Sequence, residues 1–195
     1  MNEQILPEAY FDSLSIAHKL DNFLDGFERN EIHLFSYFSA ILYHYAGNPV
    51  GDWKYQFIIS AEGYPHSKYL DDSIERHLIN GYFEEKGKFF IITGRGTDEF
   101  NKFSKSFPTY KEREKYIDAA CSTSILIPYK ETQKALLEDP NLKKSLKLEN
   151  QDWILFDKDK LKEITKALGI PPNELIMPAV NWIKYLLMRI NNING

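Results

Sequence analysis

The sequence contains one cysteine, Cys121, among its 195 residues. A single thiol excludes a disulfide within the chain and any zinc site built on Cys-x-x-Cys spacing. Cys121 lies between Ala120 and Ser122 on an apolar helical stripe. We therefore interpret it as a buried structural thiol rather than as a nucleophile.

Long apolar runs are also missing. No charged segment followed by an apolar segment opens the chain, as a signal peptide would require. The longest apolar stretch, residues 175–190, is interrupted by Pro178, Asn181 and Lys184. It falls short of the ~18 apolar residues that a membrane-spanning helix needs. We therefore expect a cytoplasmic protein that does not contact a membrane.

The motifs of common enzyme classes are absent as well. The chain has no GxxxxGK[ST] loop, no GxSxG elbow and no HExxH helix. A metal-dependent nuclease would need carboxylates and a lysine at a strand end, and only the stretch with Asp152, Asp157, Asp159 and Lys160 has that composition. It lacks the Asp/Glu-x-Lys spacing, and helix capping explains its carboxylates. We predict a protein without catalytic activity, cofactor or metal ion.

What the chain does have is enough apolar material for a core. Hydrophobic residues make up 43% and aromatic residues 14% of the sequence, which fits one domain or two small ones. The net charge of −4 is unevenly distributed. Residues 1–106 hold ten Lys and Arg against sixteen Asp and Glu, and the remainder holds fourteen against twelve. The acidic half is therefore poorly suited to binding phosphates.

Apolar periodicity predicts a mainly α-helical fold. In the first eighty residues it predicts four helices: Tyr10 to Phe27, Glu31 to Ala46, Val50 to Ser60, and a helix capped by Ser67 that ends at Asn80-Gly81. His33, Tyr37 and His44 share one edge of the second helix. Two histidines on one face could bind a metal ion or titrate together, but flanking a packing surface is the favoured interpretation.

Two short strands, residues 82–85 and 88–93, are predicted around the turn at Lys86-Gly87. The second strand ends in Thr93-Gly94-Arg95-Gly96, and Thr97 is expected to cap a helix that runs through Phe103. Helices followed by a hairpin that ends in Thr-x-x-Gly resemble a winged helix-turn-helix domain of the MarR and PadR kind. The resemblance covers about seventy residues and implies a wing formed by the two strands.

The remaining residues, 107–195, are predicted to be mostly helical. The expected helices are residues 110–127, 129–138, 141–148 and 157–168, and a last helix that starts at Pro171 and Pro172 and is kinked at Pro178. Trp153 to Phe156 could form one strand. The predicted organisation is an N-terminal helix (1–30), a winged-helix domain (31–106) and a helical C-terminal region (107–195). A degenerate second winged helix in the last region stays open.

DNA binding by this fold would use the third helix of the winged-helix domain. Its outward residues are expected to be Lys68, Asp71, Asp72, Glu75 and Arg76, with a net charge of −1. Lys86, Lys88 and Arg95 of the wing could touch a phosphate backbone, but Glu84 and Glu85 lie beside them. Carboxylates facing phosphates are repulsive, so nucleic-acid binding is disfavoured.

The favoured function is therefore protein docking, as a non-catalytic accessory subunit. The expected docking residues are Asp71, Asp72 and Glu75 on the third helix and Trp182, Ile183 and Leu187 on the last helix. The layout is loosely similar to small winged-helix subunits of bacterial assemblies around SMC-like or ABC-type ATPases, including anti-phage defence systems. Its partner would be another protein or a second copy of the chain. The alternative is a winged-helix transcriptional regulator.

Overall fold

The computed structural model describes residues 5–147, 158–167, 169 and 174–193 of the chain. These residues are mainly helical and include two small antiparallel sheets of two strands each. The mainly α-helical fold with a short β-hairpin is thus confirmed. None of the described helices has the length and apolar character that crossing a bilayer requires.

The elements follow one another along the chain as two lists. The helices are α1 (Pro7–Asp21), α2 (Arg29–Tyr45), the 3-10 helix η1 (Val50–Trp53), α3 (Lys68–Ile79), α4 (Gly94–Ser106), α5 (Pro108–Leu126), α6 (Tyr129–Leu137), α7 (Pro140–Lys147), α8 (Lys158–Ala167) and α9 (Ile176–Ile193). The strands are β1 (Ile58–Ile59), β2 (Pro65–His66), β3 (Phe83–Lys86) and β4 (Phe89–Ile92).

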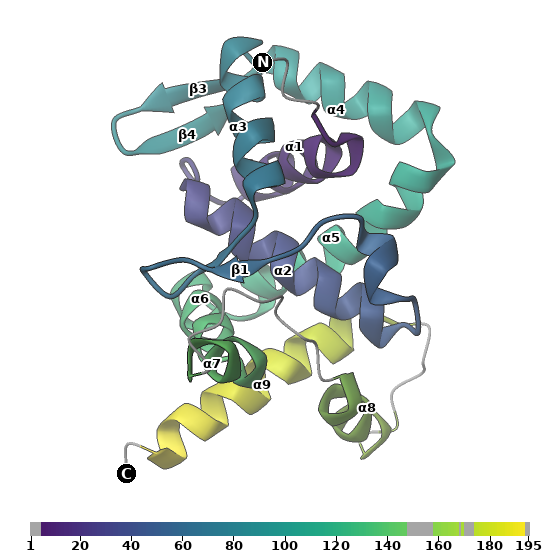
Figure 1. Cartoon of the computed structure of the whole chain (residues 1–195), viewed down its shortest axis with the longest axis vertical. Coiled ribbons are helices and arrows are strands. Elements are labelled where there is room, and N and C mark those ends of the chain that lie inside the picture. The colour runs from purple at the N-terminus through teal and green to yellow at the C-terminus, as the bar shows by residue number, and fades with distance from the viewer. Residues whose placement is uncertain (1–4, 148–157, 168, 170–173, 194–195) are drawn as a thin grey trace.

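Helix α2 is the centre of the fold. A capping box between Glu28 and Glu31 starts it, with the Glu28 backbone N–H donating to Glu31 Oε2 at 2.7 Å. It is buried on almost every side, because α1, α3, α5, α6 and α8 all pack against it. The β3–β4 hairpin and α4 lie at one end of the long axis, and α9 lies at the other (Figure 1).

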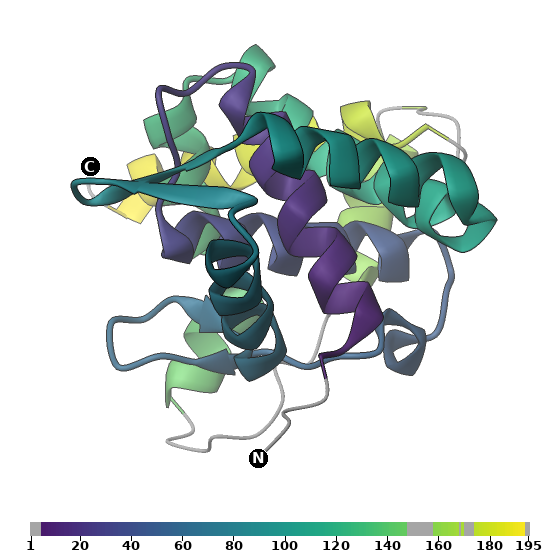
Figure 2. The ribbon, with the colours of Figure 1, turned by 90° about the horizontal axis from the view of Figure 1, so that it is seen from above.

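Helix α1 belongs with α3 and the hairpin. It packs against α2, α3, α4 and β4, and the view from above shows it crossing beneath α4 beside the hairpin (Figure 2). The chain leaving α1 also pairs with the hairpin. Phe27 and Phe90 exchange two backbone hydrogen bonds of 2.8 Å, which adds a one-residue bridge beside β4. Helices α1, α2 and α3 therefore form the helical group that supports the hairpin.

The helix predicted for Val50 to Ser60 is wrong. A short 3-10 helix occupies Val50–Trp53, and the chain then becomes extended and forms β1, which pairs with β2. The reason lies in Trp53, Tyr55 and Phe57, which are all buried. Alternate burial is the pattern of an extended chain, since successive side chains of a strand point to opposite sides.

Helix starts also differ from the sequence-based prediction. Thr93, not Thr97, caps α4, because its Oγ1 accepts a hydrogen bond from Gly96 N at 3.2 Å. Helix α9 starts at Ile176, so Pro178 lies in its first turn, where a missing N–H leaves no helical bond unmade. The predicted strand at residues 153–156 and the prolines at 171 and 172 lie outside the described residues.

One cluster of buried apolar side chains joins the described parts of the chain. It takes in residues from α1 and α2 and also from α5, α6, α8 and α9. Cys121 is a member, so its prediction as a buried thiol is confirmed. Burial raises the pKa of this thiol, which keeps it protonated and unreactive at neutral pH. The division of the chain at residues 30 and 106 stays a prediction.

Candidate functional site

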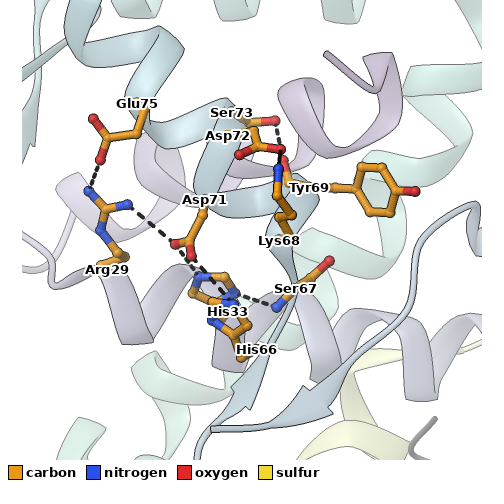
Figure 3. A network of polar contacts seen from close by, with 10 residues as sticks. All are labelled: Arg29, His33, His66, Ser67, Lys68, Tyr69, Asp71, Asp72, Ser73 and Glu75. Atoms are coloured by element: carbon orange, nitrogen blue, oxygen red, sulfur yellow. Dashed lines mark hydrogen bonds and ion pairs between the residues drawn. The ribbon is translucent and has the colours of Figure 1, made fainter. Parts of the chain in front are cut away.

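The candidate site is built on α3, where the sequence places a row of carboxylates. The structure gives each of them a cationic partner (Figure 3). Arg29, at the start of α2, reaches Asp71 Oδ1 with Nη1 at 3.3 Å and donates through Nη2 to Glu75. Lys68 Nζ lies 2.8 Å from Asp72 Oδ2. Counting Arg29 changes the net charge of this face from −1 to zero, so its carboxylates are compensated.

Beneath this face, His33 connects α2 to the start of α3. The Ser67 backbone N–H donates to His33 Nδ1 at 3.1 Å, and His33 Nε2 lies 3.0 Å from Asp71 Oδ1. Burial lowers the pKa of His33, so its ring is neutral at pH 7 and carries its proton on Nε2. Burial alone would raise the pKa of Asp71, but His33, His66 and Arg29 lower it overall. Asp71 is therefore an ionised internal anchor of α3.

The same side chains are a candidate metal site. Ligand atoms of His33, His66 and Asp71 lie within 4.8 Å of one another. However, an ion on His33 Nε2 would require the ring proton on Nδ1, which faces the Ser67 N–H donor. The two imidazole rings stack at a centroid distance of 4.8 Å and an angle of 26°, so one ion cannot lie in the plane of both. These contacts fit a hydrogen-bonded network better than a metal centre.

The outward face of α3 carries apolar side chains that the sequence-based prediction missed. Tyr69, Asp72, Arg76 and Ile79 recur at the spacing of one helical face. Ile79 is 74% exposed and Tyr69 is 46% exposed, and Tyr69 points away from the polar network (Figure 3). We call these four residues the α3 stripe. Their spacing could have revealed the stripe, but attention to charge alone selected Asp71, which lies inside.

Cationic side chains lie on and beside the hairpin. Lys86 and Lys88 are exposed on it, next to the exposed Glu84 and Glu85. Lys88 reaches Glu28 at 3.5 Å, and Arg95 lies over the Tyr82 ring at 5.9 Å from its centroid. Arg76, Lys86 and Arg95 form no ion pair with another described residue. These three cations remain available for an external anion.

The residues expected to dock through α9 lie in the core. Trp182 is buried and donates from Nε1 to Asp139 Oδ2 at 3.0 Å, and Ile183 is fully buried. Leu187 is half-buried and packs against the core. Helices α5, α6 and α8 cover this side of α9, and their packing removes Trp182 and Ile183 from the candidate docking surface.

The other histidine and acidic candidates separate from one another. His44 Nδ1 lies 2.9 Å from the Asn48 carbonyl oxygen, and Tyr37 donates to the buried Asp139 at 3.3 Å. His44 and His33 therefore do not act as a pair. Asp152 and Asp157 of the candidate nuclease stretch lie outside the described residues.

Comparisons with known protein families, with curated proteins and with solved structures found no match to this chain.

Proposed function

We propose that this chain is a non-catalytic winged-helix accessory subunit that docks onto a partner protein in a bacterial multi-protein assembly. Assemblies around SMC-like or ABC-type ATPases, including anti-phage defence systems, are the class to test first. The observation that carries the proposal is the α3 stripe. It combines two exposed apolar side chains with one acid and one base.

The order of elements supports a winged helix. Helix α1, the bridge at Phe27, helices α2 and α3 and the β3–β4 hairpin follow the order expected of that fold. Thr93 and Gly96 close the hairpin as the family's Thr-x-x-Gly pattern implies. One departure is the segment of residues 46–67, which holds β1 and β2 and is longer than the turn of about 3–4 residues in a helix-turn-helix.

The chemistry of the stripe favours protein over DNA. A helix that reads the major groove needs donors and acceptors for base edges and cations for phosphates. The α3 stripe instead exposes Ile79 and Tyr69, while Asp72 and Arg76 cancel in charge. Tyrosine, arginine and aliphatic side chains in an apolar patch with a polar rim are typical of protein interfaces.

DNA-binding regulation is the second candidate, and one observation favours it. Arg76 on α3, Lys86 on the hairpin and Arg95 at the start of α4 are exposed and form no ion pair with another described residue. The compensation of Asp71 and Glu75 by Arg29 also weakens the repulsion that the sequence alone predicts.

Co-expression with the products of neighbouring genes tests the docking function. We expect a stoichiometric complex that Ile79→Asp abolishes, because a charge would be placed at the centre of the apolar contact. Met188→Asp on α9 is the matched control, since Met188 is 65% exposed and lies on another helix. A complex that survives Ile79→Asp but not Met188→Asp would contradict docking through α3.

Fluorescence polarisation with random duplex DNA tests the alternative. Docking predicts weak binding at about 50 mM salt, because few phosphates are neutralised. Tight binding that falls steeply with salt, and that the triple change Arg76→Ala, Lys86→Ala and Arg95→Ala abolishes, would favour the regulator instead.

A further inference from the structure

A cavity of about 470 Å³ lies away from α3, where α1, the end of α2, η1 and the start of α5 meet. Its wall includes the carboxylates of Glu8, Asp52 and Glu112, the rings of Tyr43 and Tyr110, and the guanidinium of Arg113. The volume is in the range of about 300–1,000 Å³ that small-molecule sites occupy. A cavity lined by a few convergent polar groups is the usual form of such a site.

Arg113 is the buried member of this wall, with 7% of its surface exposed. Its Nε and Nη2 donate to the two carboxylate oxygens of Asp12 at 2.6 and 2.7 Å, and Nη2 also donates to the Trp53 carbonyl oxygen at 2.8 Å. The guanidinium carbon lies 3.5 Å from the centroid of the Trp53 ring. Burial would lower the pKa of Arg113, but the Asp12 carboxylate raises it overall. The charge is therefore held firmly in place.

The third guanidinium nitrogen is not used in this arrangement. Arg113 Nη1 has no hydrogen-bond acceptor among the described residues, although the side chain lines the cavity. A planar guanidinium presents its donors in fixed directions, so Nη1 is ready for an oxygen acceptor. A ligand that fills the cavity thus needs a carbonyl or carboxylate oxygen at this wall.

The other side of the cavity attracts a cation. Glu8 forms no ion pair with another described residue, Asp52 is paired with Lys54 at 3.8 Å, and Glu112 is paired with Lys115. Because Asp12 neutralises Arg113, the lining has an excess of negative charge. Burial raises the pKa of Tyr43 and Tyr110, and nearby carboxylates, Asp52 for Tyr43 and Glu8 for Tyr110, raise it further.

We propose that this cavity binds arginine or lysine, either as the free amino acid or as a residue of a peptide. The cationic head lies among Glu8, Asp52 and Glu112, where it also meets the faces of the tyrosine rings. The backbone oxygen of the ligand accepts a hydrogen bond from Arg113 Nη1. The site is independent of the docking function, because none of its residues belongs to α3 or to the hairpin.

Isothermal titration calorimetry of the full chain tests the site with three probes: L-arginine, N-acetyl-L-arginine amide and L-citrulline. Both arginine compounds carry the cation, whereas citrulline has nearly the same shape and no charge on its side chain. Binding of L-arginine alone would identify the free amino acid, and binding of the amide would identify a peptide residue. Citrulline is expected to bind about tenfold more weakly, as loss of a charge-assisted contact implies.

Charge variants supply the control. Glu8→Gln and Glu112→Gln are each expected to weaken arginine binding about 5-fold, since each removes one partly exposed carboxylate. Glu62→Gln makes the same change at an exposed residue outside the cavity and is expected to leave binding unchanged. Thermal unfolding checks that all three variants fold. No heat of binding with either arginine compound at millimolar concentration, equal binding of citrulline, or equal effects of all three variants would overturn the proposal.

Discussion

His77 on α3 is a fully buried histidine that no part of the proposed function uses. Its Nε2 lies 3.1 Å from the Tyr10 carbonyl oxygen and 2.9 Å from Ser13 Oγ. The ring packs 4.2 Å from the Tyr10 ring and 4.7 Å from the Phe83 ring, between centroids. Burial lowers the pKa of His77 to about 3, although the hydrogen bond to Tyr10 acts in the opposite direction.

This pKa predicts a loss of stability in mild acid. The unfolded chain binds a proton at His77 near pH 6.5, and the folded chain does so only near pH 3, so protonation favours unfolding as the pH falls between these values. Between pH 7 and pH 5 the contribution of His77 to the free energy of unfolding falls by about 2 kcal/mol. Urea denaturation at the two pH values measures the loss.

His77→Gln provides the comparison. The variant cannot titrate at this position, so we expect it to lose about 2 kcal/mol less than the wild type over the same interval. It will still lose some stability, because burial lowers the pKa of His33 as well. Equal losses in the wild type and His77→Gln would show that His77 is protonated at similar pH in both states.

Histidine contacts also mark the limit of sequence analysis at the residue scale. Helical spacing predicted that His33 and His44 share an edge of α2, and it could not assign their partners. His33 contacts Ser67 and Asp71, which follow it by more than thirty residues, whereas His44 contacts Asn48 four residues later. Only the packing of α3 against α2 brings the first set together.

At the scale of elements, the junction between the hairpin and α4 is locked by Thr93 and Gly96. Thr93 Oγ1 donates to the Gly81 carbonyl oxygen at 2.8 Å and accepts from Gly96 N. Thr93 N donates to the Tyr82 carbonyl oxygen at 2.9 Å. The Cα of Gly96 therefore packs directly against the backbone of Tyr82, which gives the Thr-x-x-Gly pattern a physical reason.

Gly96→Ala is predicted to destabilise the protein by about 2 kcal/mol or more, as overpacking does. Its Cβ would lie 2.5 Å from the Tyr82 carbonyl oxygen and 2.8 Å from Ile92 Cγ1, and a backbone oxygen cannot move aside easily. Gly94→Ala is the control in the same turn. Its Cβ would meet nothing within 4 Å, so the change should stay within about 0.5 kcal/mol. Thermal unfolding that ranks the two variants equally would contradict this account of the junction.

The segment after α2 shows which elements sequence periodicity predicted and which it did not. Helices α2 and α3 and the hairpin were predicted nearly to the residue, because helical spacing, the Asn80-Gly81 stop and the Lys86-Gly87 turn are local signals. Residues 50–60 were predicted as a helix from Trp53, Phe57 and Ile58. Tyr55 was the neglected residue, because with Trp53 and Phe57 it completes an alternating pattern.

For the whole molecule, α9 is part of the core rather than an appended docking helix. Ile183 is fully buried, and Trp182 satisfies the buried Asp139 together with Tyr37. These contacts connect α9 with the end of α6 and with α2, so the C-terminal region and the N-terminal helices share one core.

Ile183→Asp is therefore predicted to unfold the whole described core rather than to detach α9 alone. A carboxylate buried without a partner costs more than about 3 kcal/mol, a large share of the roughly 5–15 kcal/mol that stabilises a protein of this size. Met188→Asp on the same helix should change stability by less than about 0.5 kcal/mol, because Met188 is 65% exposed. Circular dichroism of Ile183→Asp with a wild-type melting curve would contradict the shared core.

By itself the sequence determined the helical character of the chain, the central helix α2, the hairpin and the buried thiol, because these depend on residues within a few positions of one another. Tertiary structure alone decided which charges are spent inside the protein. Arg29 reaches Asp71 and Glu75, and Asp12 holds Arg113, across separations of about forty and one hundred residues. No local pattern encodes such pairs, since they form only when packing of the apolar faces has brought distant helices together.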